Sequence, residues 1–226
     1  MIGCIVFDFD GTLVLSNHIK RQAFYDVTHS HDPSGSTVSR ILKQHPDKDR
    51  HGIFLEIVRE LFAKNEIANH HNLEALAAQW TEAYTVYCEQ AIATCEEVPG
   101  ASDALEWISQ QYIPICINSR TPTTTLVRLV TQRSFNRYTS EIYGAPATKS
   151  KNLGDILNRI QALPQDMLFV GDSEDDRQAA HEVGCHFVGI MLGHENRFTQ
   201  PPEHQITDLY QLPTIVTTLH GKSCVA

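Results

Sequence analysis

The chain of 226 residues is 42% apolar, which is enough for one sizeable hydrophobic core or for a core domain that carries a smaller insert. Its formal net charge of -9 argues against a nucleic-acid-binding module, because such a module needs a broad basic surface. A small phosphorylated ligand stays compatible with this charge, since only its own pocket must be cationic.

The six cysteines are scattered without paired spacing, which predicts reduced thiols of a cytoplasmic protein and not a disulfide framework. The first residues form a short apolar run without a basic leader, and no apolar run approaches membrane-spanning length. We therefore expect a soluble, cytoplasmic protein with no membrane or nucleic-acid partner, present as a monomer or a homodimer.

Apolar runs alternate with helical segments along much of the chain. Residues 2–9 are almost continuously apolar and lead into Asp10-Gly11-Thr12, which is typical of a buried parallel strand entering a tight turn. Further strands are predicted at 113–117, 167–170 and 186–190, each preceded by a segment with helical spacing, at 101–110, 151–161 and 175–183. The alternation predicts an α/β fold with a Rossmann-like, doubly wound parallel sheet.

The segment from residue 16 to residue 97 has helical periodicity but no convincing strand. Its two apolar stripes consist of Ile53, Phe54, Ile57, Val58, Leu61 and Phe62, and of Leu73, Leu76, Ala77, Trp80, Tyr84 and Tyr87. Aromatic side chains at this spacing favour packing in a helical core over contact with a substrate. We therefore predict a core domain of residues 1–15 and 99–226 and an all-helical insert of residues 16–98.

Two carboxylates follow the first predicted strand. Asp8 and Asp10 lie at the carboxyl end of this strand, which is the edge where open α/β sheets bind their ligands. Such a pair can share a divalent cation, and one member can attack phosphorus while the other transfers the proton of the leaving group. An acidic pair next to Gly11 is also typical of a turn without catalytic function, so the other motifs must decide.

A second acidic stretch, Asp172-Ser173-Glu174-Asp175-Asp176, follows the strand predicted at 167–170. Ser173 or Asp172 is suited to cap the next helix, whose dipole favours acids in its first turn. Capping alone does not explain four acids in this stretch, and like charges this close favour a neutralising cation. The stretch therefore predicts a magnesium site.

A hydroxyl group and a lysine complete the candidate set. Ser119 follows the strand predicted at 113–117, where its hydroxyl and nearby backbone N–H groups are suited to hold phosphoryl oxygens or to cap a helix. Lys149 and Lys151 stand near the start of the predicted helix at 151–161. Either lysine can balance the charge of a carboxylate and a phosphoryl group, and a solvated surface lysine is the alternative for each.

Taken together, these strings resemble the four ordered motifs of haloacid-dehalogenase-like hydrolases, namely Asp8-Phe9-Asp10-Gly11-Thr12, Ser119, Lys149, and Gly171-Asp172 with Asp176. The resemblance spans nearly the whole chain, and the order of the motifs is more specific than any single match. The helical insert between the first two motifs resembles the type-one cap of the phosphoglycolate-phosphatase-like and β-phosphoglucomutase-like members.

The resemblance implies roles for each matched residue. Asp8 becomes a transient aspartyl phosphate, Asp10 is the general acid and base, and the phosphoryl group is bound by Phe9, Ser119, Arg120 and Lys149. It also implies that Mg²⁺ is held by the carboxylate of Asp8, the backbone carbonyl of Asp10 and Asp172, with Asp176 supporting the site. We therefore expect a Mg²⁺-dependent phosphatase of a small phosphorylated metabolite, either phosphoglycolate-like or a sugar phosphate.

Several features bear on close alternatives. Asp10 favours phosphoryl transfer over dehalogenation, because an alkoxide leaving group needs a proton donor and a halide does not. A sugar phosphomutase stays open, although Lys20 stands in the cap region where phosphomutase-like members carry a histidine, and Leu15 stands where members with this cap often carry Asp. A phospho-acceptor signalling domain is disfavoured by the helical insert, and a P-loop protein by the lack of its glycine-lysine motif.

Two further groups carry weaker signals. The closest histidine groupings, His29-Ser30-His31 and His70-His71, lack the partners of a zinc site and predict solvated loops or helix ends. Five basic residues of the insert are candidates to meet an anionic substrate, namely Lys20, Arg21, Arg40, Lys43 and Arg50.

Overall fold

The computed structural model describes residues 1–46, 48–67, 72–193 and 197–222, so the predictions for Cys224 and for His70-His71 lie outside the described residues. The chain divides into two compact units, one made of Met1–Ser16 and Ala93–Ala226 and the other of Asn17–Ile92. The helical unit therefore begins later and ends earlier in the sequence than the predicted insert of residues 16–98.

The larger unit is built on one sheet of six strands in the order β3-β2-β1-β4-β5-β6, and every neighbouring pair is parallel. This arrangement confirms the predicted doubly wound α/β fold, because the chain leaves β1 in one direction and returns to the other side of it at β4. The strands are β1 (Cys4–Phe7), β2 (Ile115–Pro122), β3 (Glu141–Ala145), β4 (Met167–Gly171), β5 (His186–Ile190) and β6 (His204–Ile206).

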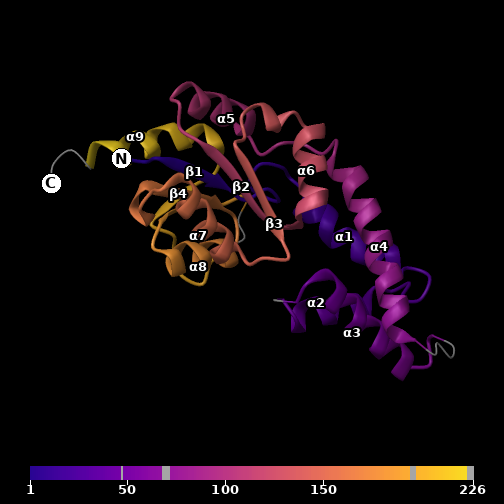
Figure 1. The fold of residues 1–226 in the computed structure, drawn as a ribbon. Coiled ribbons are helices and arrows are strands. Elements are labelled where there is room, and N and C mark those ends of the chain that lie inside the picture. Colours follow the sequence, from indigo (N-terminus) through magenta and orange to yellow (C-terminus); the bar gives the residue numbers. More distant parts are fainter. Residues whose placement is uncertain (47, 68–71, 194–196, 223–226) are drawn as a thin grey trace. The chain divides into compact units, whose positions relative to one another are not determined.

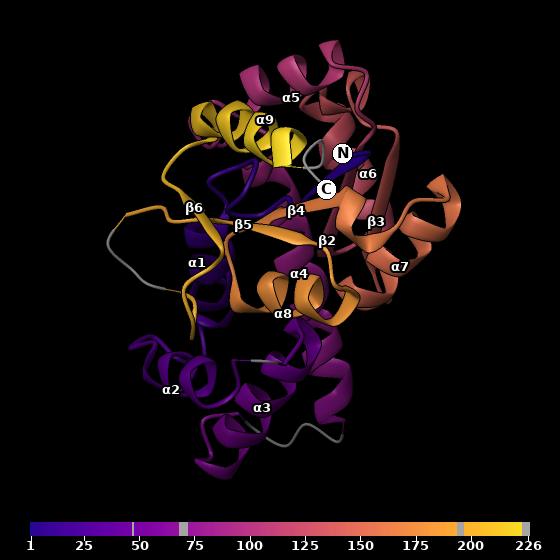
Figure 2. The ribbon, with the colours of Figure 1, turned by 90° about the vertical axis from the view of Figure 1, so that its left-hand side faces the viewer.

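Helices cover both faces of this sheet. Figure 2 shows α7 and α8 on one face and α5 and α9 on the other. The α-helices are α5 (Ala101–Gln110), α6 (Thr123–Gln132), α7 (Lys149–Ile160), α8 (Glu174–Val183) and α9 (Leu212–Lys222), and the short 3-10 helices are η1 (Phe135–Arg137), η2 (Pro164–Asp166) and η3 (Leu209–Gln211). Burial on both faces explains why the central strands read as continuous apolar runs.

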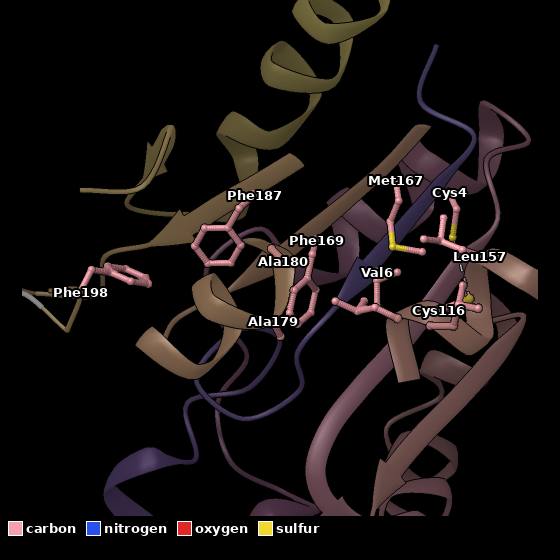
Figure 3. Packing of buried hydrophobic residues seen from close by; sticks show 12 residues of the cluster. Cys4, Val6, Cys116, Leu157, Met167, Phe169, Ala179, Ala180, Phe187 and Phe198 are labelled. Carbon is pink, nitrogen blue, oxygen red and sulfur yellow. Dashed lines mark hydrogen bonds between the residues drawn. The ribbon is translucent and has the colours of Figure 1, made fainter. Parts of the chain in front are cut away.

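The core beneath α7 and α8 is formed by side chains from β1, β4 and β5 (Figure 3). The ring of Phe187 lies 6.1 Å from that of Phe169 and 5.9 Å from that of Phe198, in edge-to-face contacts. Cys4 and Cys116 are buried on the neighbouring strands β1 and β2 as free thiols, with their Sγ atoms 4.0 Å apart. Their hydrogen bond and burial raise the pKa of Cys4, so this thiol stays protonated and acts as a small apolar side chain.

The smaller unit contains four helices, α1 (Asn17–Thr28), α2 (Ser36–Gln44), α3 (Arg50–Ala63) and α4 (Leu73–Ile92) (Figure 1). Its core is an aromatic cluster in which Phe24 lies 5.0 Å from Phe54 and 4.7 Å from Tyr84, measured between ring centroids. Trp80 and Tyr84 are buried, so they pack as the spacing predicts. Phe62 and Tyr87 differ, because they are 40% and 39% exposed at the margins of their stripes.

The chain passes from one unit to the other twice. The two segments of the larger unit next to these passages, residues 13–15 and 96–98, are hydrogen-bonded to each other. The backbone N–H of Leu15 donates to the carbonyl of Glu96 at 2.8 Å, and that of Val98 donates to the carbonyl of Leu13 at 3.0 Å. These bonds satisfy backbone groups at both crossings. Among the described residues, no helix is long and apolar enough to cross a membrane.

The central strand β4 offers a matched test of this packing. Leu168 is fully buried and Leu163 is 58% exposed. Leu168→Ala is expected to lower the free energy of unfolding by roughly 2–5 kcal/mol, because it leaves a cavity between strands and helices. Leu163→Ala is expected to change it by less than about 0.5 kcal/mol. Urea unfolding followed by circular dichroism measures both, and equal losses in the two variants would contradict the assigned core.

Candidate active site

Three chain segments meet at the carboxyl edge of the sheet. Asp8 follows β1, Ser119 lies in the second half of β2, and Asp172 follows β4. Because β1 pairs with β2 on one side and with β4 on the other, residues beyond these strand ends are brought together. The strand order reverses between β1 and β4, and doubly wound sheets bind ligands at such a point. The predicted site residues therefore converge at a physically favoured position.

The carboxyl group of Asp8 is buried at the centre of this convergence. Its Oδ1 lies 3.3 Å from the Nζ of Lys149. Among the described residues, no donor reaches Asp8 Oδ1 with hydrogen-bond geometry. Burial raises the pKa of Asp8 well above its ordinary value; Lys149 opposes this, and the nearby carboxylates Asp176, Asp172 and Asp10 add to it. A buried, incompletely satisfied oxygen of this kind is suited to bind a cation or to attack an electrophile.

Lys149 is the first residue of α7, and its ammonium group joins two carboxylates. The Nζ atom lies 2.5 Å from Asp176 Oδ1 as well as 3.3 Å from Asp8 Oδ1. Burial lowers the pKa of this lysine, but the charges of Asp176 and Asp8 outweigh burial and raise it above its ordinary value. The lysine is therefore a fixed positive charge at the site.

The local structure of α7 separates the two candidate lysines. Thr148 caps the helix by accepting a hydrogen bond from the N–H of Lys151, and the Nζ of Lys151 pairs with Asp155 on the exposed side at 2.6 Å. The backbone of Lys149 is fixed against β2, because the side chain of Asn118 donates a hydrogen bond to the Lys149 carbonyl at 3.0 Å. Of the two lysines, only Lys149 reaches the acidic cluster.

Asp10 is surrounded by hydroxyl groups. Its Oδ1 accepts a hydrogen bond from Ser16 Oγ at 2.7 Å, and its Oδ2 accepts from Thr121 Oγ1 at 2.9 Å and from Ser119 Oγ at 3.3 Å. Ser16 and Thr121 were not predicted as site residues. The alternation of strand side chains places Thr121 on the same face as Ser119 and was the signal available for it. These hydroxyls orient the Asp10 carboxyl group beside Asp8.

Three carboxylates, called here the acidic triad, can hold a metal ion: Asp8, Asp172 and Asp176 each offer an oxygen within 4.8 Å of the others. In an octahedral Mg²⁺ site with Mg–O distances of about 2.0–2.1 Å, adjacent ligand oxygens lie about 2.9 Å apart and opposite ones about 4.2 Å apart, so these three oxygens would have to draw closer to share one ion. The side chain of Asp10 is not in the triad, and the predicted ligation through its backbone carbonyl stays a prediction. Among the described residues, no histidine belongs to such a group.

The acidic stretch after β4 divides into distinct roles. Ser173 caps α8, and Asp176 completes a capping box by accepting a hydrogen bond from the N–H of Ser173 at 3.1 Å. Glu174 accepts hydrogen bonds from Arg177 at 2.6 Å and from the hydroxyl of Thr199 at 2.8 Å. Asp176 therefore belongs to both the capping box and the acidic triad, the candidate cation site.

Asp172 has a basic partner that sequence reasoning missed. Arg197, in the segment between β5 and β6, places its Nη1 2.7 Å from Asp172 Oδ2. No short motif surrounds Arg197, so the residue is recognised only once the strand order brings that segment to the carboxyl edge of β4.

Phe9 and Arg120 are the two remaining predicted phosphate contacts. The side chain of Phe9 is buried and its carbonyl accepts hydrogen bonds from the N–H groups of Leu13 and Val14 at 3.0 and 3.2 Å. The side chain of Arg120 is exposed, between the buried residues Ser119 and Thr121. Contact of these two residues with a phosphoryl group stays a prediction.

Comparison with known proteins finds a matching hydrolase family and related sequences and folds. A family model described as haloacid dehalogenase-like hydrolase matches residues 2–184. The phosphoglycolate phosphatase of Escherichia coli K12 is 31% identical over 101 residues, which covers 42% of this chain and 40% of that protein. The chain thus matches less than half the length of this curated relative.

Solved structures match over much more of the chain. A predicted phosphoglycolate phosphatase from Haemophilus somnus 129pt aligns with a TM-score of 0.71 at 19% identity, covering 95% of this chain and 98% of that one. The β-phosphoglucomutase of Clostridium difficile aligns with a TM-score of 0.73 at 13% identity, covering 100% of both chains. At sequence identities this low, the similarity shows a shared fold and nothing further.

A glycine controls how closely Asp176 approaches the strand end. A Cβ atom at Gly171 would lie 2.4 Å from Asp176 Cγ, whereas one at Gly154 in α7 would meet nothing within 4 Å. Gly171→Ala is therefore expected to displace Asp176 and to destabilise the fold by about 1–3 kcal/mol. Gly154→Ala is the control and should stabilise it by about 0.5–1 kcal/mol, through helix propensity. Urea unfolding measures both, and a neutral Gly171→Ala would contradict the tight approach.

The hydrogen bonds to Glu174 predict a pH dependence of stability. Arg177 contributes most, and with Thr199 and Gln178 it outweighs burial and lowers the pKa of Glu174 from 4.5 to about 2. Because the folded pKa is depressed, this stabilisation is fully present above pH 4.5 and is lost as the pH falls towards 2. Glu174→Gln should cost on the order of 1 kcal/mol at pH 7. Urea unfolding at pH 7 and pH 3 should show a smaller difference between native and variant at pH 3.

Proposed function

Because the chain belongs to the haloacid dehalogenase-like hydrolase family, we propose that it is a Mg²⁺-dependent phosphatase acting on a small phosphorylated metabolite, phosphoglycolate-like or a sugar phosphate. One observation carries the proposal. The buried carboxylate of Asp8 stands at the strand-order reversal with an oxygen that no described donor satisfies, 3.3 Å from the Lys149 ammonium group. This combination is what a nucleophile for a phosphoryl group requires.

Asp8 is the proposed nucleophile. Its oxygen attacks phosphorus, the bond from phosphorus to the leaving oxygen breaks, and an aspartyl phosphate forms that water then hydrolyses. The attack needs an ionised carboxylate, and Lys149 lowers the pKa of Asp8 against the effect of burial. The same ammonium group offsets the negative charge that the phosphoryl oxygens bring.

Asp10 is the proposed general acid and base. It donates a proton to the leaving alkoxide in the first half-reaction and removes one from the attacking water in the second. The hydrogen bonds from Ser16 and Thr121, at 2.7 and 2.9 Å, fix the direction in which its carboxyl group points. Ser119 donates a hydrogen bond to Asp10 Oδ2 at 3.3 Å, and we assign it to orientation of the phosphoryl group.

The acidic triad is the proposed cation site. Asp8, Asp172 and Asp176 offer hard oxygen ligands of the type that Mg²⁺ prefers. A bound Mg²⁺ would supply positive charge that favours the ionised form of Asp8 and offsets the charge of the phosphoryl group. Gly171 allows Asp176 to lie close enough to the strand end to complete this site.

The substrate class rests on family membership and on the curated phosphoglycolate phosphatases. The helical unit is the proposed cap that selects the substrate. Two of its candidate basic residues are engaged within that unit, because Arg40 pairs with Glu60 and the Arg50 guanidinium lies 5.7 Å from the centre of the Tyr84 ring.

Hydrolysis of an aryl phosphate tests the proposal. The native chain with Mg²⁺ should release phosphate, and EDTA should abolish turnover. Asp8→Asn should remove activity to background, because no nucleophile remains, and Asp10→Asn should lower kcat by about 10²–10⁴ through loss of proton transfer. Asp155→Asn is the matched control, since Asp155 lies on the exposed side of α7 beside Lys151, and should retain native turnover.

A panel of phosphoglycolate and hexose phosphates then separates phosphatase from mutase. Release of inorganic phosphate supports the proposal, whereas conversion of a hexose 1-phosphate to its 6-phosphate identifies a sugar phosphomutase. Full activity of Asp8→Asn would overturn the assigned nucleophile.

A further inference from the structure

The segment of Arg197, Phe198 and Thr199 is bound to the acidic stretch at both ends and to the core at its centre. Arg197 Nη1 lies 2.7 Å from Asp172 Oδ2, and Thr199 donates from its N–H and its hydroxyl to Glu174 at 3.1 and 2.8 Å. Phe198 is 4% exposed and packs edge-to-face against Phe187, as Figure 3 shows. The guanidinium group therefore extends from a backbone that is anchored beside the acidic triad.

Each member of the acidic triad has a basic partner among the described residues. Lys149 forms ion pairs with both Asp8 and Asp176, while Arg197 forms one with Asp172. The two bases differ in exposure, because the side chain of Lys149 is 5% exposed and that of Arg197 is 40% exposed. Lys149 is enclosed, whereas the guanidinium group of Arg197 borders solvent into which it can move.

We propose that Arg197 is an internal counter-ion that competes with the divalent cation for Asp172 and thereby weakens cation binding. This inference rests on the proposed function, since it assigns the cation to the acidic triad. A guanidinium group and Mg²⁺ carry charge of the same sign, and both bind a carboxylate oxygen of Asp172. Their repulsion at such short range favours a turn of the guanidinium group towards solvent when the cation binds.

Competition has two consequences for the chain. Arg197 holds Asp172 in a paired state without metal, which avoids an uncompensated charge beside Asp8 and Asp176. It also raises the cation concentration at which the site is half filled, because the cation must displace Arg197 from Asp172. Since Thr199 anchors the segment to Glu174, the displaced guanidinium group stays near the site and can return when the cation leaves.

Calorimetric titration of the full chain with MgCl₂ tests the proposal. Arg197→Gln should bind Mg²⁺ roughly fivefold to tenfold more tightly than the native chain, because the competing charge is gone. Arg159→Gln is the matched control. It removes an equal charge, but Arg159 lies near the end of α7 and pairs with Glu141, which is neither in the acidic triad nor an anchor of the Arg197 segment. Its Mg²⁺ affinity should stay within about twofold of the native value.

Thermal unfolding in EDTA and in saturating Mg²⁺ gives a second readout that does not depend on activity. Arg197→Gln should unfold at a lower temperature than the native chain in EDTA and should gain more from Mg²⁺. Arg197→Lys keeps a charge but loses the planar donor group, so its affinity should lie between those of the native chain and Arg197→Gln. This variant maintains the test if the glutamine variant does not fold.

Each outcome decides the question. Weaker Mg²⁺ binding by Arg197→Gln would show that Arg197 positions Asp172 for the cation, and unchanged binding would show that the two do not compete. Either result overturns this inference and leaves the proposed function standing. No Mg²⁺ binding by the native chain would overturn the cation site of the proposed function, and this inference with it.

Discussion

The ammonium group of Lys149 lies buried between two carboxylates, 2.5 Å from Asp176 Oδ1 and 3.3 Å from Asp8 Oδ1. It joins the starts of α7 and α8 to the end of β1, elements far apart in the chain. Without this charge, two buried carboxylates would face each other at high electrostatic cost. The capping box of α8, the glycine before Asp172 and the inward-facing start of α7 all serve to place these three groups. The local structure thus positions one buried ammonium group to compensate two buried carboxylates.

The parallel sheet supplies the rigidity that this balance needs. β1 is paired on both sides and covered on both faces, so Asp8 extends from a fixed backbone. β2 brings Ser119 and Thr121 to the neighbouring position, where hydroxyl groups orient Asp10. The two carboxylates of one short motif consequently have different surroundings, since Asp8 faces the Lys149 ammonium group and Asp10 faces hydroxyls. This difference in environment supports the proposed division between a nucleophile and a proton carrier.

Prediction from sequence succeeded where a signal was local and strong. The central strands are continuous apolar runs because both faces are buried, and they were found near their observed positions. β3 and β6 were missed. β3 is only half-buried and β6 has three residues, so neither produces a long apolar run. Both lie at the edges of the sheet, where one side lacks a partner strand and apolar content is under less constraint.

The sequence by itself determined the fold class, the helical segment and the order of motifs around Asp8, Ser119, Lys149 and Asp172, because periodicity and short motifs are local properties of the chain. Only the tertiary structure decided that Lys149 and not Lys151 meets the acidic triad, since the two residues lie about half a helical turn apart and point to different sides. It also showed that Thr121, Ser16 and Arg197 contact the candidate site residues. The contacts of Thr121 and Arg197 join distant segments and depend on strand order, whereas the contact of Ser16 depends on how the turn after Asp10 folds back.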